Sequence, residues 1–292
     1  MSSPIQVAFL GHKGLIGSNL LSPLLKSHQE GKINLIILHR QGSDVSSPNI
    51  SGLEKRVIQL DEEGLEINKE AMEGLEVVIS SITSPAILSQ TYFLEALKGS
   101  KTLKTFIHSD FGGNFTSEDL AHDGMALMAL KPKVVARAVE LGVPITNVRT
   151  GMFAEIVFGY NALGINVKEN SFEVYKDNIK NQLRTTTLPY WAHALSQLIL
   201  DPLKLANKTI QLYDHTPTGQ EIIDTLSKIH GTPTKLTHYT TEQYEKDVLD
   251  PQSAIQASVK RAWGEDDFGE GEQPEVSGWV GKDLEELLRG YL

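Results

Sequence analysis

Three glycines follow an apolar run near the start of the chain: Gly11, Gly14 and Gly17, in the segment GHKGLIG. Backbone N–H groups at the beginning of a helix can bind phosphate where no Cβ stands in the way. The spacing differs from the G-x-G-x-x-G pattern that is usual for dinucleotides. Two interpretations stay open at this point. The segment is either a cradle for a diphosphate, with Lys13 adding charge, or an empty turn with a solvated lysine.

A second apolar run ends in His39 and Arg40, within LIILHRQGS. A carboxylate at this position usually binds the free 2′-hydroxyl of an adenosine ribose, whereas arginine suits a 2′-phosphate. No acidic residue follows Arg40 before Asp44. The segment therefore favours NADP(H) over NAD(H). The alternative is that Arg40 is an ordinary surface arginine.

Small polar residues end a further apolar run, in ISSITSP. Such residues would let the diphosphate and the nicotinamide ribose of a dinucleotide lie across the tips of the strands. The alternative is a simple turn in which Ser84 caps the next helix. The candidates by position are Ser80, Ser81, Ile82 and Thr83.

The first half of the chain must position these residues, and it alternates apolar strands with helical patterns. Such an alternation predicts a parallel sheet covered on both faces, with ligands beyond the carboxyl ends of its strands. The predicted strands are Ile5–Leu10, Ile33–Leu38, Lys55–Leu60, Glu76–Ile82, Lys104–Ser109 and Pro144–Arg149, and the predicted helices are Leu15–Lys26, Ile67–Met72, Pro85–Lys98 and Met125–Leu141.

Beyond Thr150 the pattern is less regular. Helical patterns cover Phe153–Leu163 and Gly219–His230, and Asp266–Gly278 reads as an exposed acidic loop. We therefore expect an α/β fold: a Rossmann-like, doubly wound parallel sheet with a smaller C-terminal substrate-binding lobe. The expected division is residues 1–150 for an NADP-binding domain and 151–292 for a lobe that does not fold independently.

Composition excludes several classes of function. The 292 residues carry a formal charge of −10 and contain no cysteine. The charge argues against nucleic acid as a partner, and the lack of cysteine excludes disulfides and thiolate metal sites. No run of apolar residues approaches the roughly 20 that span a bilayer. We expect a cytoplasmic protein with no metal, no nucleic acid and no membrane partner, and a homodimer stays open as its assembly.

Several motifs occur in an order that resembles the NmrA-like family of atypical short-chain dehydrogenases, and within it the group of isoflavone reductases and phenylcoumaran benzylic ether reductases. Members of that group have a G-x-x-G-x-x-G turn, an arginine after the second strand, and then a PSEFG-like motif. The counterparts here are GHKGLIG, Arg40 and HSDFG, followed by KPKV, GVPIT and GMFAEI. The resemblance covers nearly the whole chain.

The resemblance implies a catalytic lysine near the nicotinamide, and the matching residue is Lys131. A lysine at the start of a helix lies beside the positive end of the helix dipole, which suits a role in proton transfer. The alternative, from sequence alone, is a solvated helix lysine. The candidate cofactor-binding residues are Gly11, His12, Lys13, Gly14, Leu15, Ile16, Gly17, His39, Arg40, Ser80, Ser81, Ile82, Thr83, Lys131, Met152 and Phe153, and the candidate substrate residues are Phe111, Phe153 and Tyr160.

Departures from the family fall where a substrate would meet the cofactor. Gly151 and Met152 replace an asparagine and a cysteine, and no tyrosine is followed by a lysine four positions later. We therefore expect an NADPH-dependent reductase acting on a small apolar or aromatic carbonyl, enone or benzylic substrate, with Lys131 assisting proton transfer. The alternative is a redox sensor that binds NADP(H) without turnover; Lys131 favours the enzyme.

Overall fold

The computed structural model describes residues 3–292. The chain forms two compact units and passes between them several times. Unit 1 comprises Met1–Asp110, Leu130–Val148 and Ala192–Ile210, and unit 2 comprises Phe111–Ala129, Arg149–Trp191 and Gln211–Leu292. The expected division of the chain at residue 150 stays a prediction.

A seven-stranded sheet in the order β11-β6-β5-β4-β1-β2-β3 organises unit 1. The pairs β1–β2, β2–β3, β1–β4, β4–β5 and β5–β6 are all parallel, which confirms the predicted Rossmann-like class. Strand β1 lies between β2 and β4, so the strand order reverses there. The strands are β1 (Ile5–Leu10), β2 (Ile33–Arg40), β3 (Glu54–Ile58), β4 (Val77–Ser80), β5 (Thr105–Ile107), β6 (Ile145–Arg149) and β11 (Thr209–Gln211).

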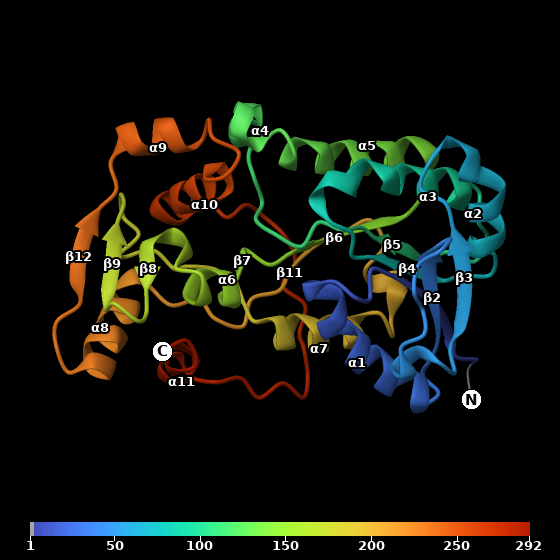
Figure 1. The fold of residues 1–292 in the computed structure, drawn as a ribbon, viewed down its shortest axis with the longest axis horizontal. Coiled ribbons are helices and arrows are strands. Elements are labelled where there is room, and N and C mark those ends of the chain that lie inside the picture. The colour runs from blue at the N-terminus through green and yellow to red at the C-terminus, as the bar shows by residue number, and fades with distance from the viewer. Residues whose placement is uncertain (1–2) are drawn as a thin grey trace. The chain divides into compact units, whose positions relative to one another are not determined.

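Helices cover both faces of this sheet. Figure 1 shows α3 and α5 side by side on one face and α1 on the other. The α-helices are α1 (Leu15–Gln29), α2 (Leu65–Met72), α3 (Thr91–Leu97), α5 (Lys131–Leu141) and α7 (Leu188–Leu198), of which α7 begins in unit 2. The short 3-10 helices are η1 (Pro48–Ile50), η2 (Glu62–Gly64), η3 (Ser84–Gln90) and η7 (Pro202–Lys204).

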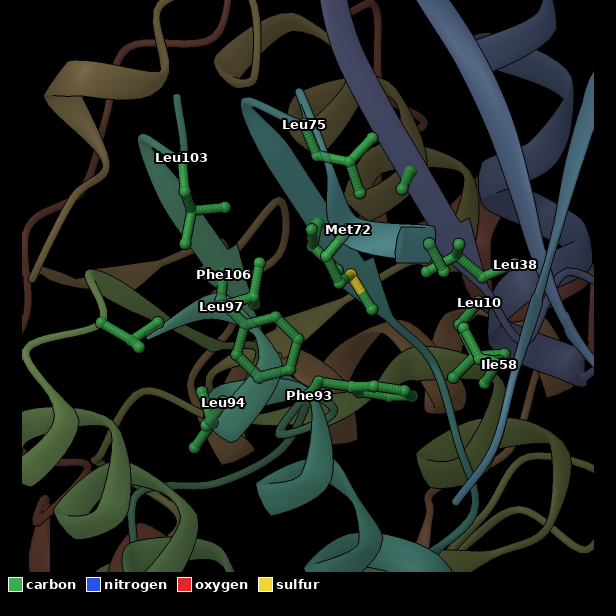
Figure 2. Close-up of a cluster of buried hydrophobic side chains, with 14 of the residues drawn as sticks. Leu10, Leu38, Ile58, Met72, Leu75, Phe93, Leu94, Leu97, Leu103 and Phe106 are labelled. Carbon is green, nitrogen blue, oxygen red and sulfur yellow. The ribbon is translucent and has the colours of Figure 1, made fainter. Parts of the chain in front are cut away.

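One core cluster of unit 1 lies between the sheet and α2, α3 and α5. Phe93 of α3 and Phe106 of β5 are completely buried, and Met72 of α2 packs in the same cluster. Figure 2 shows these side chains converging with Leu10 and Leu38, which come from the ends of β1 and β2. Burial of large apolar side chains contributes about 1.5–3 kcal/mol each, so this cluster fixes where the strand ends lie.

Two predicted helices are interrupted. The segment expected to be helical over Met125–Leu141 begins at the last residue of η4 (Asp123–Met125) and contains η5 (Met128–Leu130), and α5 begins only at Lys131. Pro132 explains the late start, because proline favours the first turn of a helix. Likewise, the first half of Pro85–Lys98 is the 3-10 helix η3. The side chain of Ser84, considered as a cap, lies outside the described residues.

Unit 2 has its own core, built on a three-stranded sheet in the order β12-β9-β8 and a two-stranded pair of β10 and β7. Phe172 and Trp263 are buried in that core, with ring centroids 5.6 Å apart. Helix α8 has the bounds predicted from sequence, with a capping box between Thr218 and Glu221. The remaining elements are α4 (Ser117–Ala121), β7 (Met152–Phe153), α6 (Ala154–Gly159), η6 (Ala162–Gly164), β8 (Ile165–Asn166), β9 (Ser171–Val174), β10 (Thr185–Thr186), α8 (Gly219–His230), β12 (Lys235–His238), α9 (Thr241–Asp247), α10 (Ala254–Glu265) and α11 (Leu284–Arg289).

Within residues 3–292, the helices are all too short or too polar to span a bilayer.

Candidate functional site

The glycine turn between β1 and α1 is built by close approach of backbone to backbone. A Cβ on Gly11 would lie 2.1 Å from the carbonyl oxygen of Ser81, and a Cβ on Gly17 would lie 1.9 Å from that of Gly11. Gly11 also has a φ of +93°, which side chains rarely allow. Gly14 differs, because the nearest atom to its Cβ would be 3.7 Å away. Gly11 and Gly17 therefore shape the turn, whereas Gly14 leaves open space at the start of α1.

A cavity of about 430 Å³ opens beyond the carboxyl ends of β1, β2 and β4. This is the point at which the strand order reverses, where ligands bind in open α/β sheets. Of the predicted cofactor residues in unit 1, Leu15, Ile16, Gly17, Ser80 and Lys131 are not among the residues that line it. Those that line it are Gly11, His12, Lys13, Gly14, His39, Arg40, Ser81, Ile82 and Thr83.

Sequence reasoning missed six residues of the cavity. Ser43 and Asp44 come from the loop after β2. Leu10, Leu38, Leu60 and Ala86 supply apolar surface. An apolar wall with a few polar groups is typical of small-molecule sites. Leu10, Leu38 and Leu60 have a sequence signal, because each lies near or just beyond the end of an apolar strand, whereas Ala86 lies within η3.

The polar side of the cavity carries both signs of charge. Nζ of Lys13 lies 3.0 Å from Oδ2 of Asp44, and both side chains are more than half exposed. His12 is buried, and its Nε2 has no hydrogen-bond partner among the described residues. Burial lowers the pKa of His12, and Lys13 and His39 lower it further. His12 is therefore neutral near pH 7, with a ring nitrogen left for a ligand.

A buried ion pair lies at the end of β5 in unit 1. Nζ of Lys131 is 2.8 Å from Oδ1 of Asp110, and the two side chains are 11% and 1% exposed. His108 Nε2 lies 3.8 Å from the other carboxylate oxygen. Nε2 of His108 also donates a hydrogen bond to Oδ1 of Asn147 at 2.7 Å. The amide nitrogen of Asn147 donates to Thr209, so the oxygen of this amide is the atom that faces His108. Lys131 is the first residue of α5, and the carboxylate of Asp110 holds its ammonium group in place.

Ser109 joins this ion pair to the cavity. Its hydroxyl donates to the carbonyl oxygen of Ile82 at 2.7 Å, and its N–H donates to the side chain of Gln90 at 2.8 Å. Ile82 lines the cavity, and Asp110 follows Ser109 directly. The HSDFG segment therefore attaches the strand end that carries Asp110 to the rim of the cavity, within unit 1.

Three aromatic rings gather in unit 2. The ring centroid of Trp191 lies 4.8 Å from that of Phe111 and 6.2 Å from that of Phe153, both in edge-on arrangements. All three side chains are buried. Tyr160 follows α6 and is 78% exposed, and among the described residues no aromatic contact joins it to this cluster. The structure therefore brings together two of the three candidate substrate residues and adds Trp191, which sequence reasoning missed.

The segment GMF, in which Gly151 and Met152 depart from the family motif, lies in unit 2. Gly151 has a φ of +61°, and a Cβ on it would lie 2.1 Å from the carbonyl oxygen of Arg184. Met152 and Phe153 form β7, which pairs in parallel with Thr185 and Thr186 of β10. The glycine therefore fits the close approach of two chain segments inside unit 2.

The side chains of residues 3–292 include no group of three or more histidines, aspartates or glutamates arranged to hold a metal ion.

Comparison with known proteins identifies the family. A model of the NmrA-like family matches residues 5–292, so this chain belongs to that family. The chain is 33% identical over 119 residues to a leucoanthocyanidin reductase of Desmodium uncinatum, a match that spans 38% of this chain and 31% of that relative. The chain thus matches less than a third of the relative's length. This membership confirms the resemblance drawn from GHKGLIG, HSDFG and KPKV.

Solved structures share the fold over the whole chain. The complex of leucoanthocyanidin reductase with NADPH from Vitis vinifera superposes with a TM-score of 0.73 at 19% identity, over 98% of this chain and 99% of that one. A structure from a study of pinoresinol-lariciresinol and phenylcoumaran benzylic ether reductases superposes with a TM-score of 0.76 at 18% identity, over the full length of both chains. At such identities the likeness shows the fold alone.

Proposed function

We propose that this protein is an oxidoreductase that binds NADP(H) in the cavity beyond β1, β2 and β4. One observation carries the proposal: Gly14 leaves space free of a Cβ at the start of α1, and Arg40 lines the same cavity. The first N–H groups of a helix have no intrahelical acceptor and suit a diphosphate, and arginine suits a 2′-phosphate. The relatives named as reductases, and the one solved with NADPH, support the same assignment.

NADPH supplies a hydride when it is bound, and the chain's own residues supply the proton. Lys131 is the candidate, because Asp110 fixes its Nζ and Ser109 attaches that segment to the rim of the cavity. Hydride would add to carbon, and Lys131 would deliver a proton to the oxygen that gains charge. Because no Tyr-x-x-x-Lys pair occurs in the sequence, the proton is assigned to Lys131 and not to a tyrosine.

Phe111 and Phe153 are the candidates for contact with an apolar or aromatic substrate. Rings of this kind provide large contact surfaces with defined edge and face geometry. The proposed substrate is therefore a small carbonyl, enone or benzylic compound. Gly151 and Met152 replace family residues in this segment, so the substrates of the relatives are not transferred to this chain.

Binding measurements test the cofactor assignment. We expect the purified protein to bind NADP⁺ more tightly than NAD⁺ by calorimetry. Arg40→Ala should weaken NADP⁺ about tenfold or more, since a charge-assisted bond contributes about 1.5–3 kcal/mol, and should leave NAD⁺ nearly unchanged. Absence of binding to either dinucleotide would overturn the proposed function. An unchanged affinity ratio in Arg40→Ala would remove Arg40 from the phosphate site.

Turnover measurements test the role of Lys131. NADPH oxidation is followed with quinones, aldehydes and enones. General acid catalysis contributes about 10²–10⁴-fold, so Lys131→Ala should lose that factor while NADP⁺ still binds. Lys133→Ala is the matched control, because Lys133 lies on the same helix and is exposed. Full turnover in Lys131→Ala would exclude its role. Tight cofactor binding with no turnover by the wild type would instead indicate a sensor.

A further inference from the structure

Asp44 lines the same cavity as Arg40, the residue assigned above to the 2′-phosphate. Its Oδ2 is 3.0 Å from Nζ of Lys13. We propose that Asp44 sets the dinucleotide preference of this site by pairing with Lys13, so that the cavity discriminates less strongly for NADP(H) over NAD(H) than its cations alone would allow. This inference rests on the proposed function.

The carboxylate of Asp44 is held in position by its own loop. Its Oδ1 accepts hydrogen bonds from the N–H of Ser46 at 2.9 Å and from the hydroxyl of Ser46 at 2.5 Å. These bonds, and then Lys13, hold the pKa of Asp44 well below its usual range. Asp44 is therefore fully ionised at neutral pH, and its second oxygen remains directed to Lys13.

The charges at the cavity decide what Asp44 does to a ligand. Among the described residues that line it, Lys13 and Arg40 are the permanent cations, and Asp44 is the carboxylate. His12 adds no charge near pH 7, because its pKa is lowered. A 2′-phosphate must therefore compete with Asp44 for Lys13 and is repelled by the same carboxylate. A free ribose hydroxyl meets no such repulsion, and a carboxylate can accept its hydrogen bond.

The variant Asp44→Asn tests this inference, because it removes the charge and keeps an oxygen that can accept from Ser46. The probes are NADP⁺, NAD⁺ and adenosine 2′,5′-bisphosphate, measured by calorimetry at fixed salt. We expect Asp44→Asn to bind NADP⁺ and the bisphosphate about three- to tenfold more tightly, as for loss of one nearby like charge in a solvated site. Binding of NAD⁺ should stay the same or weaken.

Two further variants isolate the pair. Asp201→Asn is the matched control, because Asp201 also forms an exposed pair with a lysine, Lys204, at 2.8 Å and does not line the cavity. It should leave all three affinities unchanged. Lys13→Met should weaken NADP⁺ more in the Asp44→Asn background than in the wild type, because only there is Lys13 free to pair with phosphate.

The outcomes separate this inference from the proposed function. If both dinucleotides bind and Asp44→Asn keeps the wild-type ratio, the inference is overturned and the proposed function stands. A tightening that Asp201→Asn reproduces would also overturn it, because a general charge effect would then explain the result. If the wild type binds neither dinucleotide nor the bisphosphate, the proposed function fails and the inference fails with it.

Discussion

Two strand ends at the same edge of the unit 1 sheet are built by opposite means. After β1, the turn is formed by backbone that comes so close that Gly11 and Gly17 leave no room for a Cβ. After β5, the arrangement depends on side chains, with the ammonium of Lys131 against the buried carboxylate of Asp110. The first region has no room for added atoms, and the second is destabilised when one charge of the pair is removed without the other. The two should therefore respond to opposite kinds of substitution.

The largest expected effect is at the ion pair. Asp110→Ala leaves the ammonium of Lys131 mostly buried without its partner, and breaking such a pair costs about 3–5 kcal/mol of unfolding free energy. Urea denaturation measures the loss. In the double variant Asp110→Ala with Lys131→Met, much of the stability should return, because no unpaired charge is left. A double variant that is less stable than Asp110→Ala would show that the region does not depend on charge.

The second effect is at the glycine turn. Gly17→Ala places a Cβ against the carbonyl of Gly11, and overpacking of this kind costs about 1–3 kcal/mol or more. The control is Gly31→Ala, where φ is +70° but no atom lies within 4 Å, so only backbone strain on the order of 1 kcal/mol is expected. Thermal and urea unfolding of both variants compare them. Equal losses would mean that close packing at Gly17 has no separate cost.

Gly14→Ala separates folding from binding in that turn. The nearest atom to the new Cβ is 3.7 Å away and φ is −69°, so the loss of stability should be about 1 kcal/mol or less, the cost of alanine at a helix N-cap. The methyl group would instead face a bound diphosphate, and NADP⁺ should bind about tenfold more weakly. Calorimetry and a urea titration on the same sample provide both values. Unchanged NADP⁺ affinity would remove Gly14 from the cradle.

The smallest effect concerns pH and His12. Its pKa in the folded protein is lowered by burial and then by Lys13 and His39, so the unfolded chain takes up the proton first as pH falls. The folded state therefore loses stability as pH falls below about 6.5, the ordinary value for histidine. Urea midpoints at pH 7.5 and 5.5 should differ less for His12→Asn than for the wild type. Equal differences would contradict this assignment.

Prediction from sequence was most accurate for features that a short stretch of the chain determines by itself. The bounds of β1 and α8 are as predicted, and Arg40 and the glycines lie in or beside one cavity. Lys131 was singled out, but its partner Asp110 was not, because the contact joins residues that are separated in the chain. Charge and burial of such a pair emerge only from the tertiary structure.

The short strands of unit 2 and the contacts of Trp191 could not be predicted from local sequence patterns. Strands β7 and β10 have two residues each, which is too short for an alternating pattern to appear. Trp191 lies in a helix whose apolar residues all read as core, so nothing in the sequence distinguishes its contacts with Phe111 and Phe153. The cytoplasmic location, the homodimer and the roles of the site residues stay predictions.

The ion pair also has a consequence for the path of the chain. The backbone leaves unit 1 after Asp110 and returns at Leu130, so Asp110 and Lys131 are the last and nearly the first residues on either side of that excursion. The ion pair holds the two ends of the segment Phe111–Ala129 close together and so reduces the conformational freedom of that segment. A protease cut within Phe111–Ala129 would therefore leave both new ends anchored, and the nicked protein should stay assembled as one particle.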